Sequence, residues 1–231
     1  MCGRFGFFEL KHFIELLRQL ELPFEEDEKF HFSPGYNIAP ESSITTLLGR
    51  QDKAVLTNAK WGLVPHWSKD LPKIRPINAR AESLAKKPYF RHAVNHNHCL
   101  IPASGFYEWK QSTSGRKQPW YIHRKDNSPM AFAGLWEEWH PTGSTDEQVI
   151  SCTIITTHAN REMKGVHDRM PVILEPENWK TWLDAENPQN NRLLAPSSDE
   201  TLELYPVSPK INNPQYIRKD CIERVEAEDI E

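Results

Sequence analysis

The cysteine at position 2 has the most distinctive chemistry in this sequence of 231 residues. Removal of Met1 places the α-amine and the thiol on one residue, as a 1,2-aminothiol. The amine, with an ordinary pKa of about 7.7–8.0, is partly neutral at physiological pH and can attack an aldehyde to form a Schiff base. The thiol can then close a thiazolidine ring. While Met1 is attached, the nitrogen is an amide and this route is closed.

Glu108 and His167 are candidates for proton transfer. Glu108 lies in the aromatic segment Gly105-Phe106-Tyr107-Glu108-Trp109, where loss of solvation favours a neutral acid that can give a proton to a carbinolamine. The period-2 pattern of this segment also allows a strand on which Glu108 faces solvent. His167 precedes a strand-like run at 171–174 and can act as an acid, a base or an oxyanion donor. It could equally be a turn histidine that is satisfied by Asp168.

Asn78 and two tryptophans offer groups that position other molecules. The amide oxygen of Asn78 can orient the amine of Cys2, although Asn78 is also a good N-cap for a helix predicted near 79–86. Trp61 and Trp67 flank the segment 62–66. They can provide an aromatic platform for a nucleobase, or they can belong to the core.

The charge is distributed unevenly along the chain. The net charge of −4 argues against a protein that coats nucleic acid non-specifically. Residues 60–92 are nonetheless basic, and the acidic residues lie mainly in 21–28 and after Asp220. We interpret the basic segment as a phosphate-binding strip, with solvated surface charges as the alternative. Its basic residues are Lys60, Lys69, Lys73, Arg75, Arg80, Lys86, Lys87 and Arg91.

The spacing of cysteine and histidine indicates neither a disulfide framework nor a metal centre. The four cysteines, at positions 2, 99, 152 and 221, are far apart and form no C-x-x-C pair, so we expect reduced thiols. Several residues of the types that bind metals follow residue 91, but their spacing matches no strong zinc-binding pattern. They are His92, His96, His98 and Cys99. We therefore expect no metal and no cofactor.

The pattern of apolar residues predicts a strand-rich domain with few helices. One helix is predicted over 9–20, from one-sided apolar spacing, and others near 79–86, at 160–165 and from Pro176. Strand-like runs lie at 44–49, 53–57, 98–102, 119–123, 130–136, 149–156, 171–174 and 203–207, with hairpin loops predicted at 112–116 and 141–146. Because strands do not alternate regularly with helices, we predict a mixed, mainly antiparallel α+β domain.

Charged residues interrupt the N-terminal segment, and no later stretch approaches the length of a membrane span. We therefore expect a cytoplasmic protein.

A series of motifs resembles, in the same order, those of the SOS response-associated peptidase (SRAP) family. The series covers nearly the whole chain, and its agreement in order outweighs the alternative interpretations of the single residues. The motifs are Met1-Cys2-Gly3-Arg4-Phe5, Tyr36-Asn37-Ile38-Ala39-Pro40, Trp61-Gly62-Leu63-Val64-Pro65-His66-Trp67, Ile77-Asn78-Ala79-Arg80-Ala81-Glu82, Ile101-Pro102-Ala103-Ser104-Gly105-Phe106-Tyr107-Glu108-Trp109, His167-Asp168-Arg169-Met170-Pro171 and Pro206-Val207-Ser208.

The resemblance implies a protein that crosslinks to abasic sites in single-stranded DNA. It implies a single compact α+β domain of curved, mainly antiparallel, barrel-like β-sheets with flanking helices. Cys2 would be the nucleophile, and Asn78 would position its amine. Glu108 would be the general acid and base, and His167 would assist Schiff-base formation, ring opening or reversal. The family name also implies a peptidase, which fits self-removal of Met1; removal by an aminopeptidase is the alternative.

The resemblance assigns DNA contacts as well. Arg4, Arg80 and Arg169 match positions at which the family binds phosphates, and Trp67 matches its base-stacking region. The chain departs from the family where arginines are common, at Pro88 and at His98; Lys86, Lys87 or Arg91 are the candidates to replace them.

We expect the domain to span residues 1–220, followed by an acidic tail at 221–231. We also expect a monomer that is associated with the nucleoid when it is bound to DNA. Two other functions remain open. One is a non-covalent module that binds single strands through Trp61, Trp67 and arginines, and the other is a thiol peptidase that acts on other proteins through Cys2 and His167.

Overall fold

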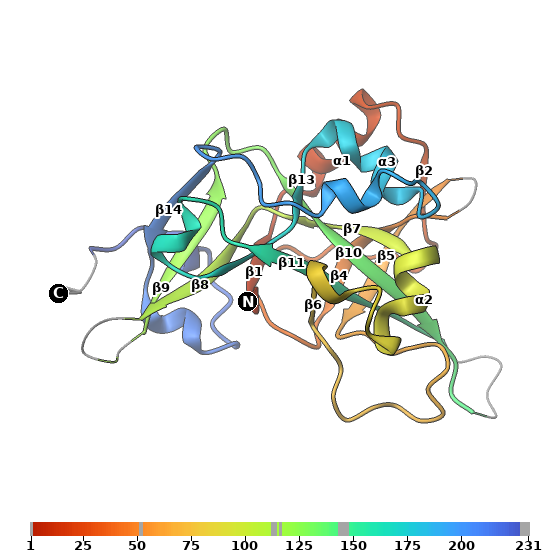
Figure 1. Ribbon diagram of the computed structural model, residues 1–231. Helices are drawn as coiled ribbons and strands as arrows, with labels where there is room; N and C mark the ends of the chain where they lie inside the picture. Colours follow the sequence, from red (N-terminus) through yellow and green to blue (C-terminus); the bar gives the residue numbers. More distant parts are fainter. Residues whose placement is uncertain (1, 51–52, 112–114, 116, 143–147, 227–231) are drawn as a thin grey trace.

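The N-terminal strand lies inside a five-stranded antiparallel sheet (Figure 1). The computed structural model describes residues 2–50, 53–111, 115, 117–142 and 148–226. The strand order of this sheet is β14-β9-β8-β1-β3, and all neighbouring strands are antiparallel. The strands are β1 (Phe5–Phe7), β3 (Gly35–Ile38), β8 (Gly105–Gln111), β9 (Lys117–Arg124) and β14 (Leu202–Pro206).

A second sheet closes into a mixed barrel of five strands. The ring runs β11-β10-β7-β4-β5, and a parallel pairing of Cys152 in β11 with Trp61 in β5 closes it. The other pairings in the ring are antiparallel. The strands are β4 (Ser43–Leu48), β5 (Ala54–Trp61), β7 (His98–Ala103), β10 (Met130–Trp139) and β11 (Val149–His158).

Short strands extend this barrel. On one side, β2 (Phe24–Glu26) runs parallel to β5, and β6 (Asn78–Arg80) runs parallel to β11. On the other, β12 (Arg169–Pro171) and β13 (Ile173–Leu174) pair antiparallel with β11 and β10. The strands β6 and β12 therefore both border the C-terminal part of β11, which brings their side chains to one edge of the barrel.

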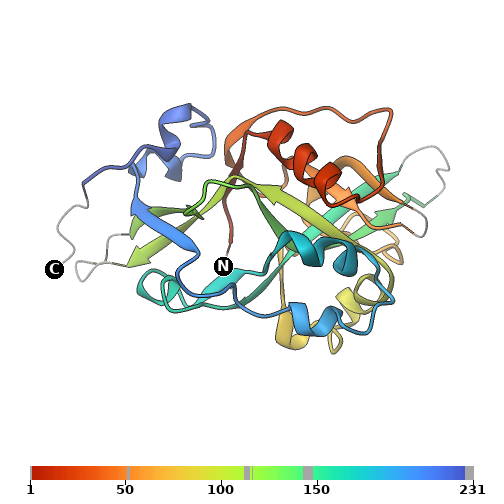
Figure 2. The same cartoon turned by 90° about the horizontal axis from the view of Figure 1, so that it is seen from above.

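Three α-helices flank the sheets in the described chain. They are α1 (Leu10–Gln19), α2 (Pro88–His96) and α3 (Trp179–Leu183) (Figures 1 and 2). The apolar face of α1 buries Phe13, Ile14 and Leu17, which stabilises an otherwise short helix through packing. In α3, the indole of Trp182 donates a hydrogen bond of 3.0 Å to the carbonyl of Cys99 in β7. None of the described helices is both long enough and apolar enough to cross a membrane.

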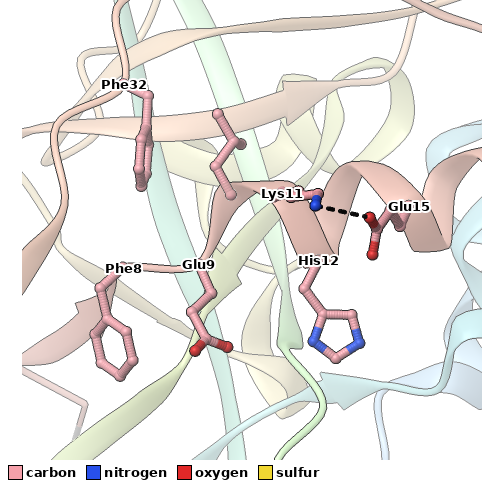
Figure 3. Close-up of a pocket in the computed structure, with 7 residues that line it drawn as sticks. Phe8, Glu9, Lys11, His12, Glu15 and Phe32 are labelled. Carbon is pink, nitrogen blue, oxygen red and sulfur yellow. Dashed lines mark ion pairs between the residues drawn. The ribbon is translucent and has the colours of Figure 1, made fainter.

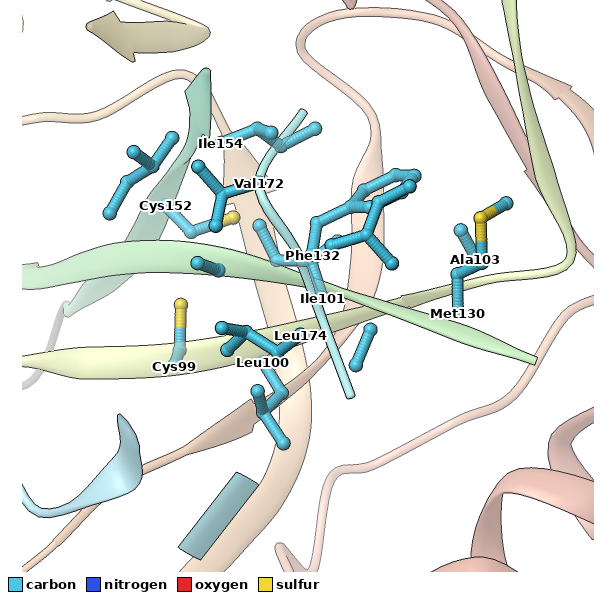
Figure 4. Close-up of a cluster of buried hydrophobic side chains, with 14 of the residues drawn as sticks. Cys99, Leu100, Ile101, Ala103, Met130, Phe132, Cys152, Ile154, Val172 and Leu174 are labelled. Carbon is cyan, nitrogen blue, oxygen red and sulfur yellow. The ribbon is translucent and has the colours of Figure 1, made fainter. Parts of the chain in front are cut away.

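The core of the barrel is filled by aliphatic side chains, with Phe132 at its centre (Figure 4). Leu100 and Ile101 of β7 and Ile154 of β11 are fully buried in this cluster. Cys99 and Cys152 point into the same cluster, and all four cysteines are buried and unpaired, as predicted. Their burial raises the pKa of both barrel thiols, that of Cys152 to about 12, so they are inert packing groups.

The predicted α+β class and mainly antiparallel pairing are confirmed, as are the helix at 9–20, the helix that follows Pro176 and the predicted strands. The pattern at 160–165 forms a 3-10 turn, Met163–Gly165. The helix predicted near 79–86 is wrong: residues 78–80 form β6, and only a 3-10 turn, Ala81–Ser83, follows. Pairing with β11 supplies the backbone hydrogen bonds of this segment and overrides its helical pattern.

The hairpins predicted at 112–116 and 141–146 join strands that do pair, β8 with β9 and β10 with β11. Residues 112–114, 116 and 143–147 themselves lie outside the described residues. At the other end of the chain, packed structure continues past the boundary predicted at residue 220. Cys221 is fully buried, and the backbone N–H of Val225 donates a hydrogen bond of 3.0 Å to Pro206. Of the predicted tail, residues 227–231 are not described.

Candidate active site

Cys2 lies three residues before the start of β1, where the antiparallel sheet meets the barrel. Both views show β1, the strand that follows Cys2, between these two parts of the molecule (Figures 1 and 2). Antiparallel pairing of β1 with β8 and β3 fixes the direction of this segment, and the N–H of Tyr107 donates to the carbonyl of Arg4 over 3.0 Å. The Cys2 side chain is fully buried. The segment that follows Cys2 is therefore held by strand pairing on both sides.

Asn78 contacts Cys2 directly. Its Nδ2 donates a hydrogen bond of 2.8 Å to the carbonyl oxygen of Cys2, and the parallel pairing of Asn78 with Ile154 holds it at the barrel edge. Its Oδ1 is buried and accepts no hydrogen bond from any described residue. The N-cap role considered for Asn78 is wrong, because no α-helix follows it. One end of the amide thus holds the Cys2 backbone, and the other end offers an acceptor.

Glu108 lies on β8 and is 3% exposed, so the alternative of a solvent-facing strand position is wrong. The residues from Gly105 to Glu108 are all buried, because this end of β8 is covered on both faces. Burial first, and the negative charge of Glu108 second, raise the pKa of the Cys2 thiol well above its ordinary value. The thiol is therefore protonated at neutral pH.

His167 faces Glu108 across the site. Its Nε2 lies 3.9 Å from Oε2 of Glu108, and its Nδ1 accepts a hydrogen bond of 2.9 Å from the backbone N–H of Arg169. Nδ1 also lies 3.0 Å from Oδ1 of Asp168, but that carboxylate is 87% exposed and free to turn toward water. The fixed backbone donor therefore decides the tautomer: the proton of the neutral ring is on Nε2, directed toward Glu108.

The three arginines assigned to DNA binding have different environments. Arg4 is largely buried: its Nη1 donates to Oδ1 of Asn37 over 2.7 Å and to the carbonyl of Ile211 over 2.8 Å. Desolvation lowers its pKa. Asn37 in turn donates to the carbonyls of Ile211, Asn213 and Tyr216, so it fastens the C-terminal segment to β3. This structural role of Asn37 was missed, although Asn37 lies inside one of the motifs.

Arg169 and Arg80 lie at the barrel edge formed by β6, β11 and β12. Arg80 is exposed. Arg169 makes two hydrogen bonds to the carboxylate of Glu82 and one of 2.7 Å to the carbonyl of Thr156. The hydrogen bond from Arg169 lowers the pKa of Glu82 to about 2. Glu82 therefore carries a negative charge beside the predicted phosphate-binding residues, which their sequence motif alone did not indicate.

Trp61 and Trp67 have different environments and therefore different roles. Trp61 is fully buried, stacks edge-on against Phe5 and donates from its indole to the carbonyl of Ile77 over 2.9 Å. It is a core residue, so it cannot serve as a platform for a base. Trp67 is 56% exposed and lies edge-on to Tyr89. Of the two, only Trp67 is accessible to a nucleobase.

The histidines and the cysteine noted after residue 91 do not converge on one point. His98 is buried, and both of its ring nitrogens contact backbone carbonyls, those of Trp182 and Val94. Cys99 belongs to the barrel core. The structure separates these two from His92, which is exposed on α2.

An open hollow beside α1 contains none of the predicted site residues. It is lined by Phe8, Glu9, Lys11, His12, Glu15, Leu10 and Phe32, and an ion pair of 3.8 Å joins Lys11 to Glu15 at its rim (Figure 3). Its ionisable side chains are solvated and lie one helical turn apart, so they are typical of the polar face of a surface helix.

Comparison with known protein families identifies the family of this chain. The sequence pattern of the family described as SOS response associated peptidase (SRAP) matches residues 1–214. The chain belongs to the SRAP family. Among SRAP relatives, abasic site processing protein YoqW of Bacillus subtilis is 40% identical over 230 residues, which covers 96% of this chain and 99% of YoqW. Abasic site processing protein YedK of Escherichia coli is 31% identical over 188 residues, covering 80% and 81% of the two chains.

The SRAP fold of this chain also matches a solved structure. A protein from Bacteroides thetaiotaomicron superposes with a TM-score of 0.82, at 22% identity, over 97% of this chain and 100% of that one. The match confirms the single α+β domain with barrel-like sheets that the resemblance implied.

Proposed function

We propose that this SRAP protein processes abasic sites in single-stranded DNA by forming a covalent bond through Cys2. The names of its relatives support the substrate, since the relatives described above are abasic site processing proteins. The observation that carries the proposal is the convergence of four side chains from separate parts of the sequence. Asn78 donates a hydrogen bond to the carbonyl of Cys2, and the charge of Glu108 raises the pKa of the Cys2 thiol. Glu108 in turn faces His167.

The reaction begins at the α-amine of Cys2 after Met1 is removed. The neutral amine attacks C1′ of the ring-opened abasic sugar, and a proton moves from nitrogen to oxygen to give a carbinolamine. Glu108 in its acid form gives a proton to the hydroxyl group, which leaves as water, and a protonated Schiff base remains. Oδ1 of Asn78 accepts no hydrogen bond within the described part of the chain, and we assign it as the acceptor for the amine, because Nδ2 of the same amide already holds the Cys2 carbonyl.

The thiol acts second. Because burial and Glu108 raise its pKa, it attacks as a thiol and not as a preformed thiolate. Its sulfur forms a bond to C1′ while its proton passes to the Glu108 carboxylate, which restores the acid. The product is a thiazolidine, and no oxidant or reductant is consumed. His167, with its Nε2 proton directed at Glu108, stabilises the carboxylate between the two proton transfers and assists the reverse opening of the ring.

The DNA strand is expected to approach along the barrel edge. Arg80 is exposed there, and Arg169 lies beside it. We assign both to phosphate contacts and Trp67 to base stacking. Arg4 contributes through the segment that it holds behind Cys2, since its guanidinium donates to Asn37 and Ile211. The same site is the candidate for removal of Met1.

A denaturing gel tests the proposal. Mature protein is mixed with a single-stranded oligonucleotide that contains one abasic site, and a heat-stable adduct is expected. Cys2→Ala removes the thiol and leaves an N-terminal amine, so it can give only a Schiff base, which borohydride traps and heat destroys. A protein whose Met1 is retained is expected to give neither product.

An adduct of equal yield and heat stability in Cys2→Ala contradicts the covalent role of the thiol. Salt-dependent binding to intact strands without any adduct favours the non-covalent module instead. Turnover of an unrelated peptide, lost in both Cys2→Ala and His167→Ala, favours a thiol peptidase.

A further inference from the structure

Three metal-ligand side chains that take no part in the Cys2 site meet on the surface of the barrel. They are His66 in the turn after β5, His92 on α2 and Glu137 on β10. Nδ1 of His66 lies 3.0 Å from Oε2 of Glu137, and Nδ1 of His92 lies 3.1 Å from Oε1. One ligand atom from each residue lies within 4.8 Å of the other two. Two imidazoles therefore converge on the two oxygens of one carboxylate.

The carboxylate is buried, and the imidazoles are open to solvent. The side chain of Glu137 is 1% exposed, whereas each imidazole is 42% exposed. The two histidines are the only ion-pair partners of Glu137 among the described residues, and no lysine or arginine of the described chain pairs with it. A buried carboxylate needs positive charge beside it. An ion that enters from solvent between the imidazoles would supply that charge.

Each of the three ligands is held by structure behind it. The loop that carries His66 is fixed to β11, since the N–H of Val64 donates to Oγ of Ser151 over 2.9 Å. It is also fixed to β10, since the indole of Trp139 donates to the carbonyl of Ser68 over 2.6 Å. The end of α2 is joined to β10 where the N–H of Trp136 donates to the carbonyl of Asn97 over 3.0 Å. The geometry is therefore preorganised.

We propose that His66, His92 and Glu137 bind a divalent transition-metal ion of the zinc class. Ligand atoms about 2.0–2.1 Å from a tetrahedral zinc ion lie about 3.3 Å from one another. The two separations between an imidazole nitrogen and a carboxylate oxygen, 3.0 and 3.1 Å, are close to this value. The three ligand atoms lie within 4.8 Å of one another, so the exposed imidazoles must turn to bring all three to one ion. Two imidazoles with one carboxylate select such an ion over Mg²⁺ or Ca²⁺, which prefer oxygen ligands alone. Three protein ligands leave a fourth position for water.

The sequence did not predict this metal site, because its three ligands are separated by 26 and 45 residues along the chain, at positions 66, 92 and 137. Of the histidines noted after residue 91, only His92 takes part. The bound ion would connect a loop, a helix and a barrel strand, and that loop carries Trp67 immediately after His66. Metal binding is thus expected to fasten the segment around Trp67 to the barrel.

Calorimetric titration of metal-stripped protein with Zn²⁺ tests the site. We expect one equivalent to bind, and a melting temperature that rises by roughly 5–10 °C at a free Zn²⁺ concentration about 100-fold above Kd. Glu137→Gln and His66→Ala are expected to weaken binding by more than the roughly 10–100-fold that loss of an outer-shell partner costs. His66→Ala changes an exposed turn residue, so it keeps the test valid if Glu137→Gln fails to fold.

Two controls distinguish the site from other zinc-binding groups. His140→Ala removes another exposed histidine, just beyond β10, and Cys2→Ala removes the thiol of the proposed active site. Both variants are expected to bind Zn²⁺ like the parent protein. The proposal is overturned if less than one-tenth of an equivalent binds, if Glu137→Gln and His66→Ala both bind with the parental Kd, or if binding disappears in Cys2→Ala.

Discussion

Replacing Glu108 by glutamine isolates proton transfer in the proposed reaction. The change keeps the size of a side chain that is only 3% exposed, and it keeps a polar side chain facing Nε2 of His167. What it removes is the carboxyl group that can give up and take back a proton. Because the polar environment is preserved, the fold should remain intact, and any loss of rate reports on chemistry.

The size of the effect follows from the site. Loss of a general acid and base commonly costs about 10²–10⁴ in rate, which corresponds to roughly 2.7–5.4 kcal/mol of activation free energy. His167 lies 3.9 Å from the lost carboxylate and can take over part of the transfer. We therefore expect the lower part of this range, about 10²–10³, for adduct formation by Glu108→Gln.

The rate is measured on denaturing gels under single-turnover conditions, with excess mature protein over the abasic oligonucleotide. Affinity for an intact oligonucleotide should stay within about threefold of the parent, since Glu108 makes no assigned phosphate contact. Glu175→Gln is a matched control: its carboxylate pairs with Arg124 and has no role in the proposed site. Equal rates of adduct formation in Glu108→Gln and the parent would remove Glu108 from the mechanism.

The same variant should also change the pKa of the Cys2 thiol, which can be measured separately from the rate of crosslinking. The charge of Glu108 contributes to the raised pKa of the Cys2 thiol, so glutamine should lower that pKa. Alkylation of Cys2 by a small thiol reagent, followed as a function of pH, should then begin at lower pH. A disrupted site would also slow crosslinking, but it would not leave a single titration of the thiol at a lowered pKa. Slower crosslinking together with a lowered thiol pKa therefore distinguishes the loss of proton transfer from damage to the fold.

Three further changes test the surroundings of the site. Asn78→Ala leaves the Cys2 carbonyl without its donor, which costs about 1–3 kcal/mol, so adduct formation should slow by roughly 5- to 150-fold on the same gels. Arg4→Ala removes two buried hydrogen bonds of a charged group and should lower the free energy of unfolding by about 3 kcal/mol, seen as a fall in melting temperature of roughly 6–12 °C; an unchanged melting temperature would contradict its structural role. Glu82→Gln frees Arg169 for phosphate and should steepen the dependence of log affinity on log salt by about 0.7 for single strands. Because the pKa of Glu82 is lowered to about 2, the charge lost is present across neutral and mildly acidic pH, so this effect should be the same between about pH 5 and 8, and an effect confined to one end of that range would refute the assignment.

Local patterns predicted the elements of this fold better than their pairing. The helix at 9–20 was predictable because its apolar spacing matches the face that packs on the core, where Phe13 and Leu17 are fully buried. The closure of the barrel was not, because it depends on a parallel contact between Trp61 and Cys152, which are 91 residues apart. The helix predicted near 79–86 failed for the same reason, since β11 captures that segment as a strand.

The candidate site shows a similar division. Cys2, Asn78, Glu108 and His167 were predicted from motifs, and the structure places the first two in contact and the last two face to face. The burial of Arg4 was not predictable, because its partner carbonyl belongs to Ile211, at the other end of the chain. Motifs identify which side chains carry chemistry, whereas long-range packing decides which of them water and substrate can reach.

The raised pKa of Cys2 bears on the choice between the covalent DNA function and a thiol peptidase. A cysteine that attacks peptides works as a thiolate, and its environment lowers its pKa through a neighbouring cation or a helix N-terminus. Here burial and a carboxylate do the opposite. A protonated thiol is a poor first nucleophile but an adequate second one, once the amine has converted the aldehyde into a protonated Schiff base, which is far more electrophilic than a peptide carbonyl. The direction of the Cys2 pKa shift therefore supports the proposed reaction, in which the amine acts first, over a reaction that begins with a thiolate.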